Sequence, residues 1–169
     1  MQSYVCAKSK VFGSNATMLI NREDEAVVES LKSALMINKS RKYVTFGSDL
    51  PQRQGDYGLE FIGGMAWLVR AMASDETKVK RRVADRHVEE EIFIQRLMPV
   101  EALQIYGRHN AVNALVALAL AELAGCNLAP MLFGLREYRG EPHRVESLGC
   151  INGIEYFDDI VTFCNKTKE

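Results

Sequence analysis

The apolar residues in the first part of the chain follow the spacing of strands and helices in turn. Short apolar runs at residues 17–20 and 43–46 predict strands. Between these strands, apolar side chains recur at helical spacing over residues 25–36. Asn21 and Asp24, which come just before this segment, are residue types that cap helix N-termini.

The middle of the chain continues with extended segments. Residues 56–62 and 65–69 flank a Gly-Gly pair, and two extended runs around such a pair predict a β-hairpin. Residues 74–90 are strongly charged and predict a solvated loop or a helix surface. Strand-like alternation returns over residues 91–97.

Three further segments predict helices. Residues 107–125 form the clearest of them, an Ala/Leu-rich run that is apolar nearly all round, so we expect it to be buried. Gly125 is well placed to end it, because glycine is common directly after a helix. Residues 128–136 predict a second helix, and residues 1–12, with a loose apolar face, predict one at the start of the chain.

A second hairpin is predicted near the end of the chain. Residues 145–150 and 154–158 are extended runs around Asn152-Gly153, a pair that is typical of two-residue hairpin turns. Strands and helices are therefore mixed along the whole chain. This order favours an α/β fold with a mixed sheet, flanking helices and two β-hairpins.

Composition and charge exclude several classes of partner. The 169 residues suit one domain or most of one, and a net charge of −1 creates no field that would draw the chain to nucleic acid or a membrane. A short basic run at residues 78–82 is surrounded by acidic residues, which favours a solvated loop. No segment has the apolar length of a membrane span. We expect neither nucleic acid nor membrane as a partner.

The four cysteines are far apart in the sequence and show no CxxC spacing. Structural zinc sites and redox motifs need such spacing, so none is predicted. We expect free thiols and a cytoplasmic, reducing environment for all of them: Cys6, Cys126, Cys150 and Cys164.

The start of the long helix carries the clearest candidate binding residues. Asn110 and Asn113 are three residues apart and therefore share a helix face near the free backbone N–H groups of the first turn. An asparagine amide donates and accepts together, which matches the edge of an adenine ring. The alternative is structural: Asn110 is then only an N-cap and Asn113 only a satisfied buried polar group.

Two residues near the second hairpin are further candidates. Arg144 has a planar fork of donors that suits phosphate or ribose oxygens, or it forms a surface ion pair with Glu141 or Glu146. Asp159 follows the last predicted strand, where a carboxylate can accept from ribose hydroxyls, or it caps a helix or solvates a turn. Lys8 has no feature of its own that separates it from a solvated charge.

Five segments, taken together and in order, resemble the Mur ligase family over residues 1–159. The helix run GRHNAVNALVALALAELAG is similar to the GxHNxxNALAALALA helix of the family's central domain. LREYRGEPHRVE and NGIEYFDD resemble the F-x-G-x-PHR-x-E and NGVxYxDDSKGTN segments of the branch that adds D-glutamate. YVCAKSKVF resembles its YxxAKxxIF helix, and MLINREDEAVV resembles its VxNxDDxxV segment. The fold expected from this resemblance is a Mur ligase central domain.

The resemblance implies an ATP-dependent ligation. In the family, ATP phosphorylates the carboxylate of UDP-N-acetylmuramoyl-L-alanine, the amine of D-glutamate attacks the acyl phosphate, and Mg²⁺ neutralises charge. By position, Asn110 and Asn113 would contact adenine, and Arg144 and Asp159 would contact ribose or phosphate. Lys8 matches a lysine that becomes carbamylated in the family, where the carbamate holds Mg²⁺.

Departures from the family limit what we expect of this chain. The family's GTNGKST phosphate loop does not occur in the sequence, and residues 160–164 replace its SKGTN segment. We therefore expect a partial central domain over residues 1–159 and an unrelated tail over residues 160–169. Such a chain should be inactive alone, with Lys8 uncarbamylated, and should form a homo-oligomer through an exposed sheet edge. The alternative is a non-catalytic module that binds adenine nucleotides or mediates interactions.

Overall fold

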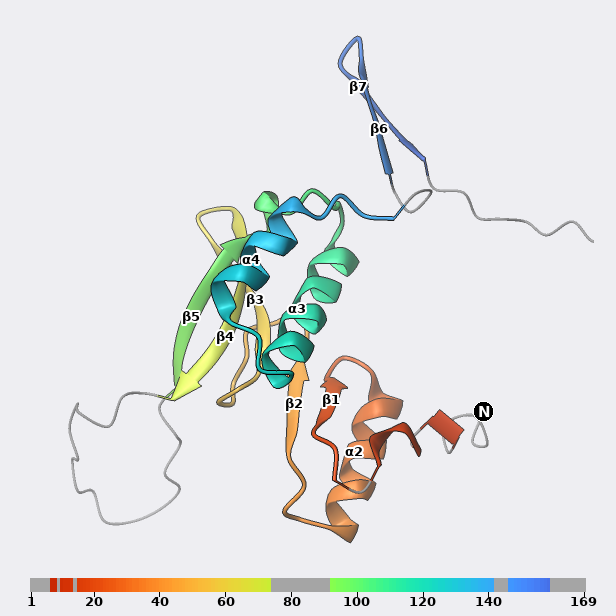
Figure 1. The fold of residues 1–169 in the computed structure, drawn as a ribbon, viewed down its shortest axis with the longest axis vertical. Coiled ribbons are helices and arrows are strands. Elements are labelled where there is room, and N and C mark those ends of the chain that lie inside the picture. The colour runs from red at the N-terminus through yellow and green to blue at the C-terminus, as the bar shows by residue number, and fades with distance from the viewer. Residues whose placement is uncertain (1–6, 9, 14, 74–91, 142–145, 159–169) are drawn as a thin grey trace, which may run out of the picture.

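The computed structural model describes residues 7–8, 10–13, 15–73, 92–141 and 146–158. It has a mixed α/β architecture with a five-stranded sheet, flanking helices and a separate two-stranded hairpin, as predicted (Figure 1). Its elements, in chain order, are η1 (Lys10–Phe12), β1 (Met18–Asn21), α2 (Glu25–Ile37), β2 (Tyr43–Phe46), β3 (Tyr57–Ile62), β4 (Met65–Ala73), β5 (Ile92–Pro99), η2 (Val100–Ala102), α3 (Arg108–Leu123), α4 (Leu128–Glu137), β6 (Glu146–Ile151) and β7 (Ile154–Asp158).

The five-stranded sheet has a parallel part and an antiparallel part. Its order is β1-β2-β3-β4-β5, with β1, β2 and β3 parallel and β3, β4 and β5 antiparallel. The register between β2 and β3 consists of the pair Phe46–Tyr57, so the two parts meet at a narrow junction. The first predicted hairpin is confirmed as β3 and β4, although β4 continues to Ala73, four residues beyond the prediction.

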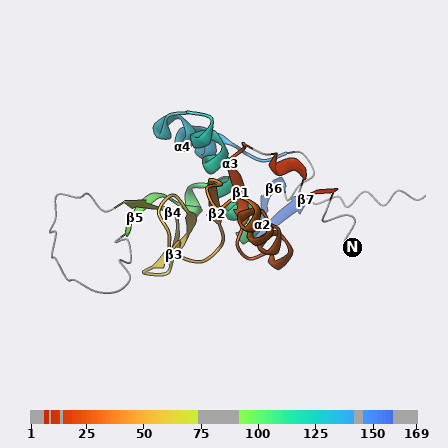
Figure 2. The same cartoon turned by 90° about the horizontal axis from the view of Figure 1, so that it is seen from below.

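Helices cover both faces of the parallel strands. Met18 and Ile20 of β1 are fully buried against α2, whereas Leu19 faces the core that α3 shares with the antiparallel strands. This division follows from the period of two in a strand, which sends successive side chains to opposite faces. Asp24 caps α2 as predicted, accepting hydrogen bonds from the N–H groups of Ala26 and Val27. Figure 2 shows α3 and α4 together on one side of β3, β4 and β5.

Only one face of α3 is buried, which corrects the expectation of a helix buried all round. Its buried residues are Ala111, Ala114, Leu115, Leu118 and Ala119, which pack against the sheet. Leu120 and Leu123 are 54% and 47% exposed, because α3 lies across one face of the sheet and α4 covers only part of the rest. Gly125, with φ of 85°, follows the helix end as predicted.

The second predicted hairpin is also confirmed. β6 and β7 pair antiparallel through a turn in which Asn152 and Gly153 have φ of 54° and 80°, the positive values of a type I′ turn. The hairpin projects from the body of the molecule in Figure 1. At the other end of the chain, Ala7 and Lys8 are helical, while the rest of the predicted first helix before Lys10 lies outside the described residues. So does the charged segment at residues 74–90.

Candidate functional site

Polar side chains gather where β1 and β2 end, the edge at which α/β sheets usually bind ligands. Arg22, directly after β1, donates from Nε to Asp49 Oδ1 at 2.6 Å and from Nη2 to the Asp49 carbonyl oxygen at 2.7 Å. Its Nη1 donates to the Tyr57 carbonyl oxygen at 2.7 Å. This one guanidinium therefore ties the end of β1 to the loop after β2 and to the start of β3.

Glycine is required beside this arginine. A Cβ at position 58 would lie 2.1 Å from the Asp49 carbonyl oxygen and 2.9 Å from Arg22 Nη2. The nearest of these atoms belongs to the backbone and cannot move without moving the loop. Gly58 thus allows β3 to approach the loop closely enough for Arg22 to hydrogen-bond both the Tyr57 carbonyl oxygen of β3 and Asp49 of the loop.

A second group of side chains fastens the N-terminal end of α3 to the same edge. The Glu23 carboxylate accepts from the Ser48 backbone N–H at 3.1 Å and from the Ser48 hydroxyl. Arg108, the first residue of α3, donates to the Ser48 hydroxyl oxygen and lies 3.9 Å from Glu23 Oε1. The hydrogen bonds from Ser48 hold the pKa of the Glu23 carboxyl below its ordinary value of 4.5.

Asn110 and Asn113 lie beside this edge and contact each other. Asn110 Nδ2 donates to the Tyr106 carbonyl oxygen at 2.7 Å, and Asn113 Nδ2 donates to Asn110 Oδ1 at 3.5 Å. The N-cap of α3 is Gly107, which makes no side-chain cap, and Asn113 is exposed. The structural alternative for this pair, an N-cap and a satisfied buried amide, is therefore wrong in both its parts.

The other candidate residues are placed less completely. Arg144 and Asp159 lie outside the described residues, so their predicted roles stay predictions. Lys8 is exposed. Within the described part of the chain, no group of three or more His, Cys, Asp or Glu residues could hold a metal ion. Of the cysteines, Cys126 and Cys150 are free and exposed, while Cys6 and Cys164 lie outside the described residues.

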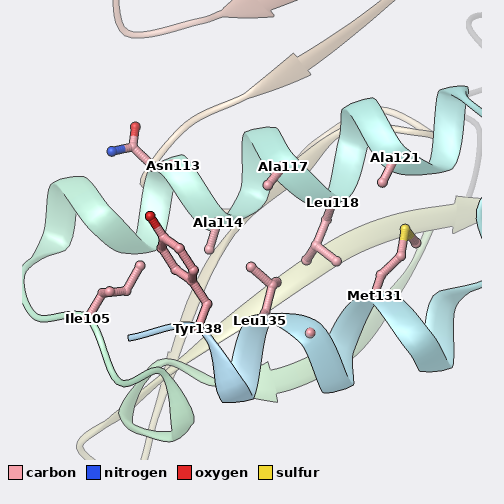
Figure 3. A pocket seen from close by; sticks show the side chains of 10 residues that line it. Ile105, Asn113, Ala114, Ala117, Leu118, Ala121, Met131, Leu135 and Tyr138 are labelled. Carbon is pink, nitrogen blue, oxygen red and sulfur yellow. The ribbon is translucent and has the colours of Figure 1, made fainter. Parts of the chain in front are cut away.

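An apolar cavity of about 470 Å³ lies between α3 and α4, next to Asn113 (Figure 3). Its walls are mostly aliphatic, with Leu118 and Leu135 facing each other across it and Tyr138 at one end. Figure 3 shows the Asn113 amide at the rim, with its oxygen directed away from α4. Asn113 therefore lines the cavity at its rim, with its amide oxygen directed away from α4.

A third polar cluster, at the C-terminal end of α3, was not predicted from the sequence. The Glu122 carboxylate accepts from the buried Tyr57 hydroxyl and from Arg70 Nη1. Arg70 Nε in turn donates to Gln95 Oε1 at 2.7 Å. Burial and, after it, the hydrogen bond to Glu122 raise the pKa of the Tyr57 hydroxyl well above its ordinary value of 10.0. We call Tyr57, Arg70 and Glu122 the Glu122 cluster.

The arrangement has the fold of a Mur ligase. It superimposes with a TM-score of 0.56 on a solved UDP-N-acetylmuramoyl-L-alanyl-D-glutamate--2,6-diaminopimelate ligase, covering 89% of this chain and 27% of the other at 20% sequence identity. For MurF from Acinetobacter baumannii the TM-score is 0.54, over 94% of this chain and 29% of the other, again at 20% identity. No family model matches the chain. At this level of identity the superpositions establish the fold alone.

Sequence relatives indicate which kind of Mur ligase this chain resembles. The chain is 56% identical over 163 residues to the UDP-N-acetylmuramoylalanine--D-glutamate ligase of Polaromonas sp., and 55% identical over 163 residues to that of Albidiferax ferrireducens. It is 45% identical to the Paraburkholderia phymatum ligase of the same name. Each match covers 94% of this chain but only 27% to 32% of the relative. The predicted resemblance to part of a D-glutamate-adding Mur ligase is thereby confirmed.

Proposed function

We propose that this chain acts as part of an ATP-dependent ligase that joins D-glutamate to UDP-N-acetylmuramoyl-L-alanine in the bacterial cytoplasm. The observation that carries the proposal is the 56% identity over 163 residues to a ligase of that name. The Mur ligase fold supports it, and the same findings favour a partial ligase over a separate nucleotide-binding or interaction module. The stretch from residue 1 to residue 159 would be the central-domain part, followed by a tail over residues 160–169.

The contribution of this part would be to bind the adenosine of ATP. Asn113 presents an amide to solvent in the second turn of α3. The first residue of this helix, Arg108, contacts Ser48 after β2, at the edge where ligands of α/β sheets bind. Asn113 would read the adenine edge, with Asn110 beside it, and Arg144 and Asp159 would contact ribose or phosphate. The sequence contains no GxxxxGK[ST] phosphate loop, which cradles the β- and γ-phosphates, so those phosphates should add little to binding by this chain.

Metal binding and chemistry would need more of the ligase than these residues supply. Lys8 would act as a carbamate ligand to Mg²⁺ in the intact enzyme, because a carbamate offers the hard oxygen atoms that this cation prefers. An ammonium group offers none, so Lys8 in its ordinary form cannot be a ligand. We propose that this chain alone does not release phosphate from ATP when given both amino-acid and nucleotide substrates.

Calorimetric titration of the purified chain with Mg-ATP and, separately, with adenosine tests the proposal. Adenosine recognition without phosphate recognition predicts affinities within about tenfold of each other, which is about 1.4 kcal/mol. Binding of Mg-ATP that is much tighter than binding of adenosine would show a phosphate site that this account lacks. Absence of binding for both ligands would show that the adenosine site is not formed by this chain.

A further inference from the structure

The inference concerns the hairpin of β6 and β7, and it rests on the adenosine site proposed above. We propose that Tyr106 and Phe157 are positioning residues: their ring contact holds the hairpin against the loop before α3, so that α3 and the Asp159 carboxylate after β7 can serve one nucleoside. Loss of this contact should therefore weaken binding of adenosine, which has a ribose, and spare binding of adenine, which has none.

A contact between two aromatic rings joins the hairpin to the body of the molecule. The ring centroids of Tyr106 and Phe157 lie 5.4 Å apart, and the ring planes meet at 76°, which is an edge-to-face arrangement. This geometry brings the positive edge of one ring to the negative face of the other, and aromatic pairs prefer it to a face-to-face sandwich. The contact therefore favours one direction of approach between the hairpin and the loop before α3.

The hairpin needs such an anchor, because much of its apolar surface is uncovered. Figure 1 shows the hairpin projecting from the body of the molecule. Three of its apolar side chains, Leu148, Ile151 and Ile154, are 58% to 65% exposed. A two-stranded hairpin is at best marginally stable in water unless it packs against another element. We therefore expect the ring contact with the body to determine how the hairpin is oriented.

Tyr106 contacts α3 and the hairpin through different atoms. Its backbone carbonyl oxygen accepts from Asn110 Nδ2 at 2.7 Å, whereas its ring contacts Phe157. Tyr106 lies directly before Gly107, the N-cap of α3. Replacement of the Tyr106 side chain thus removes the ring contact and leaves the backbone acceptor of Asn110 in place. The effect of such a replacement can therefore be assigned to the hairpin.

The position of Phe157 also limits how far away Asp159 can lie. Asp159, to which the proposed function assigns a ribose contact, is two residues further along the sequence. Two residues span at most about 7 Å even when the chain is fully extended. A hairpin held at Phe157 therefore keeps this carboxylate within a short reach of the loop before α3. On a loose hairpin the carboxylate would have to be ordered when the nucleoside binds, which costs conformational entropy.

The test is a titration of the full chain with adenosine and with adenine, followed by NMR so that weak binding is measured. Phe157→Ala should weaken adenosine binding by about threefold to tenfold, the range of an edge-to-face contact, and should leave adenine binding within about twofold. Tyr106→Ala should have the same effect. The double variant should bind adenosine no more weakly than either single variant, because all three lose one shared contact.

Two further variants serve as controls. Phe157→Tyr keeps a ring at this position and should keep the adenosine affinity. Tyr156→Ala is the matched control, because this neighbouring aromatic side chain has a similar exposed fraction, 46% against 41% for Phe157, but lies on the opposite face of β7. It should leave the affinities for both ligands within about twofold.

The comparison of the two ligands separates positioning from a general structural effect, since a loosened α3 would weaken adenine and adenosine alike. Equal losses for both ligands, or no loss for adenosine, would overturn the proposal. A second measurement needs no ligand: in the free protein, NMR relaxation should show the backbone amides of the hairpin moving with the body. Phe157→Ala should give them independent motion, and unchanged motion would also overturn the proposal. If the unsubstituted chain binds neither ligand, the proposed adenosine site fails, and the relaxation result still decides whether the ring contact holds the hairpin.

Discussion

At its C-terminal end α3 contributes Glu122 to a polar cluster, and in its first two turns it contributes Asn110 and Asn113 to another. In the Glu122 cluster, the carboxylate accepts from both Tyr57 and Arg70, and Arg70 also donates to Gln95. Tyr57 is only 3% exposed. The hydrogen-bonding capacity of this cluster is thus largely used within the protein.

At the N-terminal end of α3, the amides of Asn110 and Asn113 differ from the Glu122 cluster in how much of their hydrogen-bonding capacity is used. Asn110 is hydrogen-bonded to Tyr106 and to Asn113, whereas Asn113 is exposed and, among the described residues, its oxygen accepts no hydrogen bond. By residue type alone, a buried tyrosine in contact with an arginine and a glutamate would be the more attractive site, because perturbed titratable groups are common where chemistry occurs. Under the proposed function, the remaining capacity to form hydrogen bonds, rather than residue type, distinguishes the proposed adenosine site from the Glu122 cluster.

The largest effect that we predict from this comparison is on stability. Glu122→Ala leaves the Tyr57 hydroxyl and Arg70, whose side chain is 13% exposed, without their acceptor. Because the Glu122 side chain is itself 44% exposed, we expect a loss of only about 2 kcal/mol in the free energy of unfolding, measured by urea denaturation. Adenosine affinity should stay within about twofold at a temperature where the variant is folded.

The control for this variant is Glu29→Ala on α2, which removes an exposed glutamate paired with Lys32 at 3.5 Å. It should change stability by no more than about 0.5 kcal/mol. Asn113→Ala gives the opposite pattern, with weaker adenosine binding and nearly unchanged stability. The comparison breaks down if Glu122→Ala weakens adenosine binding as strongly as Asn113→Ala does, because the Glu122 cluster would then be part of the ligand site.

Local patterns predicted the elements of this fold well, since turns and helix ends depend on neighbouring residues. The hairpin at Asn152-Gly153 and the Asp24 cap both follow from a few adjacent side chains. The polar clusters could not be found in this way. Glu122 and Tyr57 are 65 residues apart in the sequence, and Arg22 and Asp49 are 27 apart. Their contacts depend on which strands pair, and apolar periodicity does not specify that.

In the candidate site, too, local spacing could be predicted from the sequence, whereas contacts that depend on the fold could not. Spacing alone placed Asn110 and Asn113 on one face of α3, and the structure confirms that their amides meet. The donor direction between them could not be predicted, because it depends on the Tyr106 carbonyl and therefore on where the helix begins. The apolar composition of α3 suggested burial all round, but composition does not tell which elements pack against a helix. Leu120 and Leu123 are accordingly half exposed.

A smaller effect is expected at alkaline pH. The pKa of Tyr57 is raised in the folded state above its ordinary value of 10.0, so the folded protein keeps this proton when the unfolded chain has lost it. The stability from this group is therefore complete below pH 10.0 and falls as the pH rises further. Tyr57→Phe removes the titrating group. Between about pH 9 and pH 11, its unfolding free energy should fall less steeply, by at most about 1.4 kcal/mol per pH unit.

Urea titrations of both proteins across this range measure the difference, and the remaining tyrosines and lysines contribute equally to both curves. Equal slopes would mean that the Tyr57 hydroxyl is not held by Glu122, and the picture of an internally satisfied cluster would then be wrong. At neutral pH, Tyr57→Phe should cost about 1 kcal/mol, because one hydrogen bond to a carboxylate is lost while the ring remains packed.

The smallest predicted effect lies at acid pH, at the N-terminal end of α3. The Glu23 carboxyl has a folded pKa below 4.5, so its contribution is present above that pH and is lost as the pH falls through the folded pKa. Glu23 is 44% exposed, and solvent screening should keep the contribution below about 1 kcal/mol. Glu23→Gln should therefore show a slightly flatter acid limb in denaturation curves. Because Glu23 contacts Ser48 and Arg108 but not the Asn110 and Asn113 amides, adenosine affinity should stay within about twofold. A clear loss of adenosine affinity would mean that the position of the N-terminal end of α3, as well as the two amides, determines the proposed site.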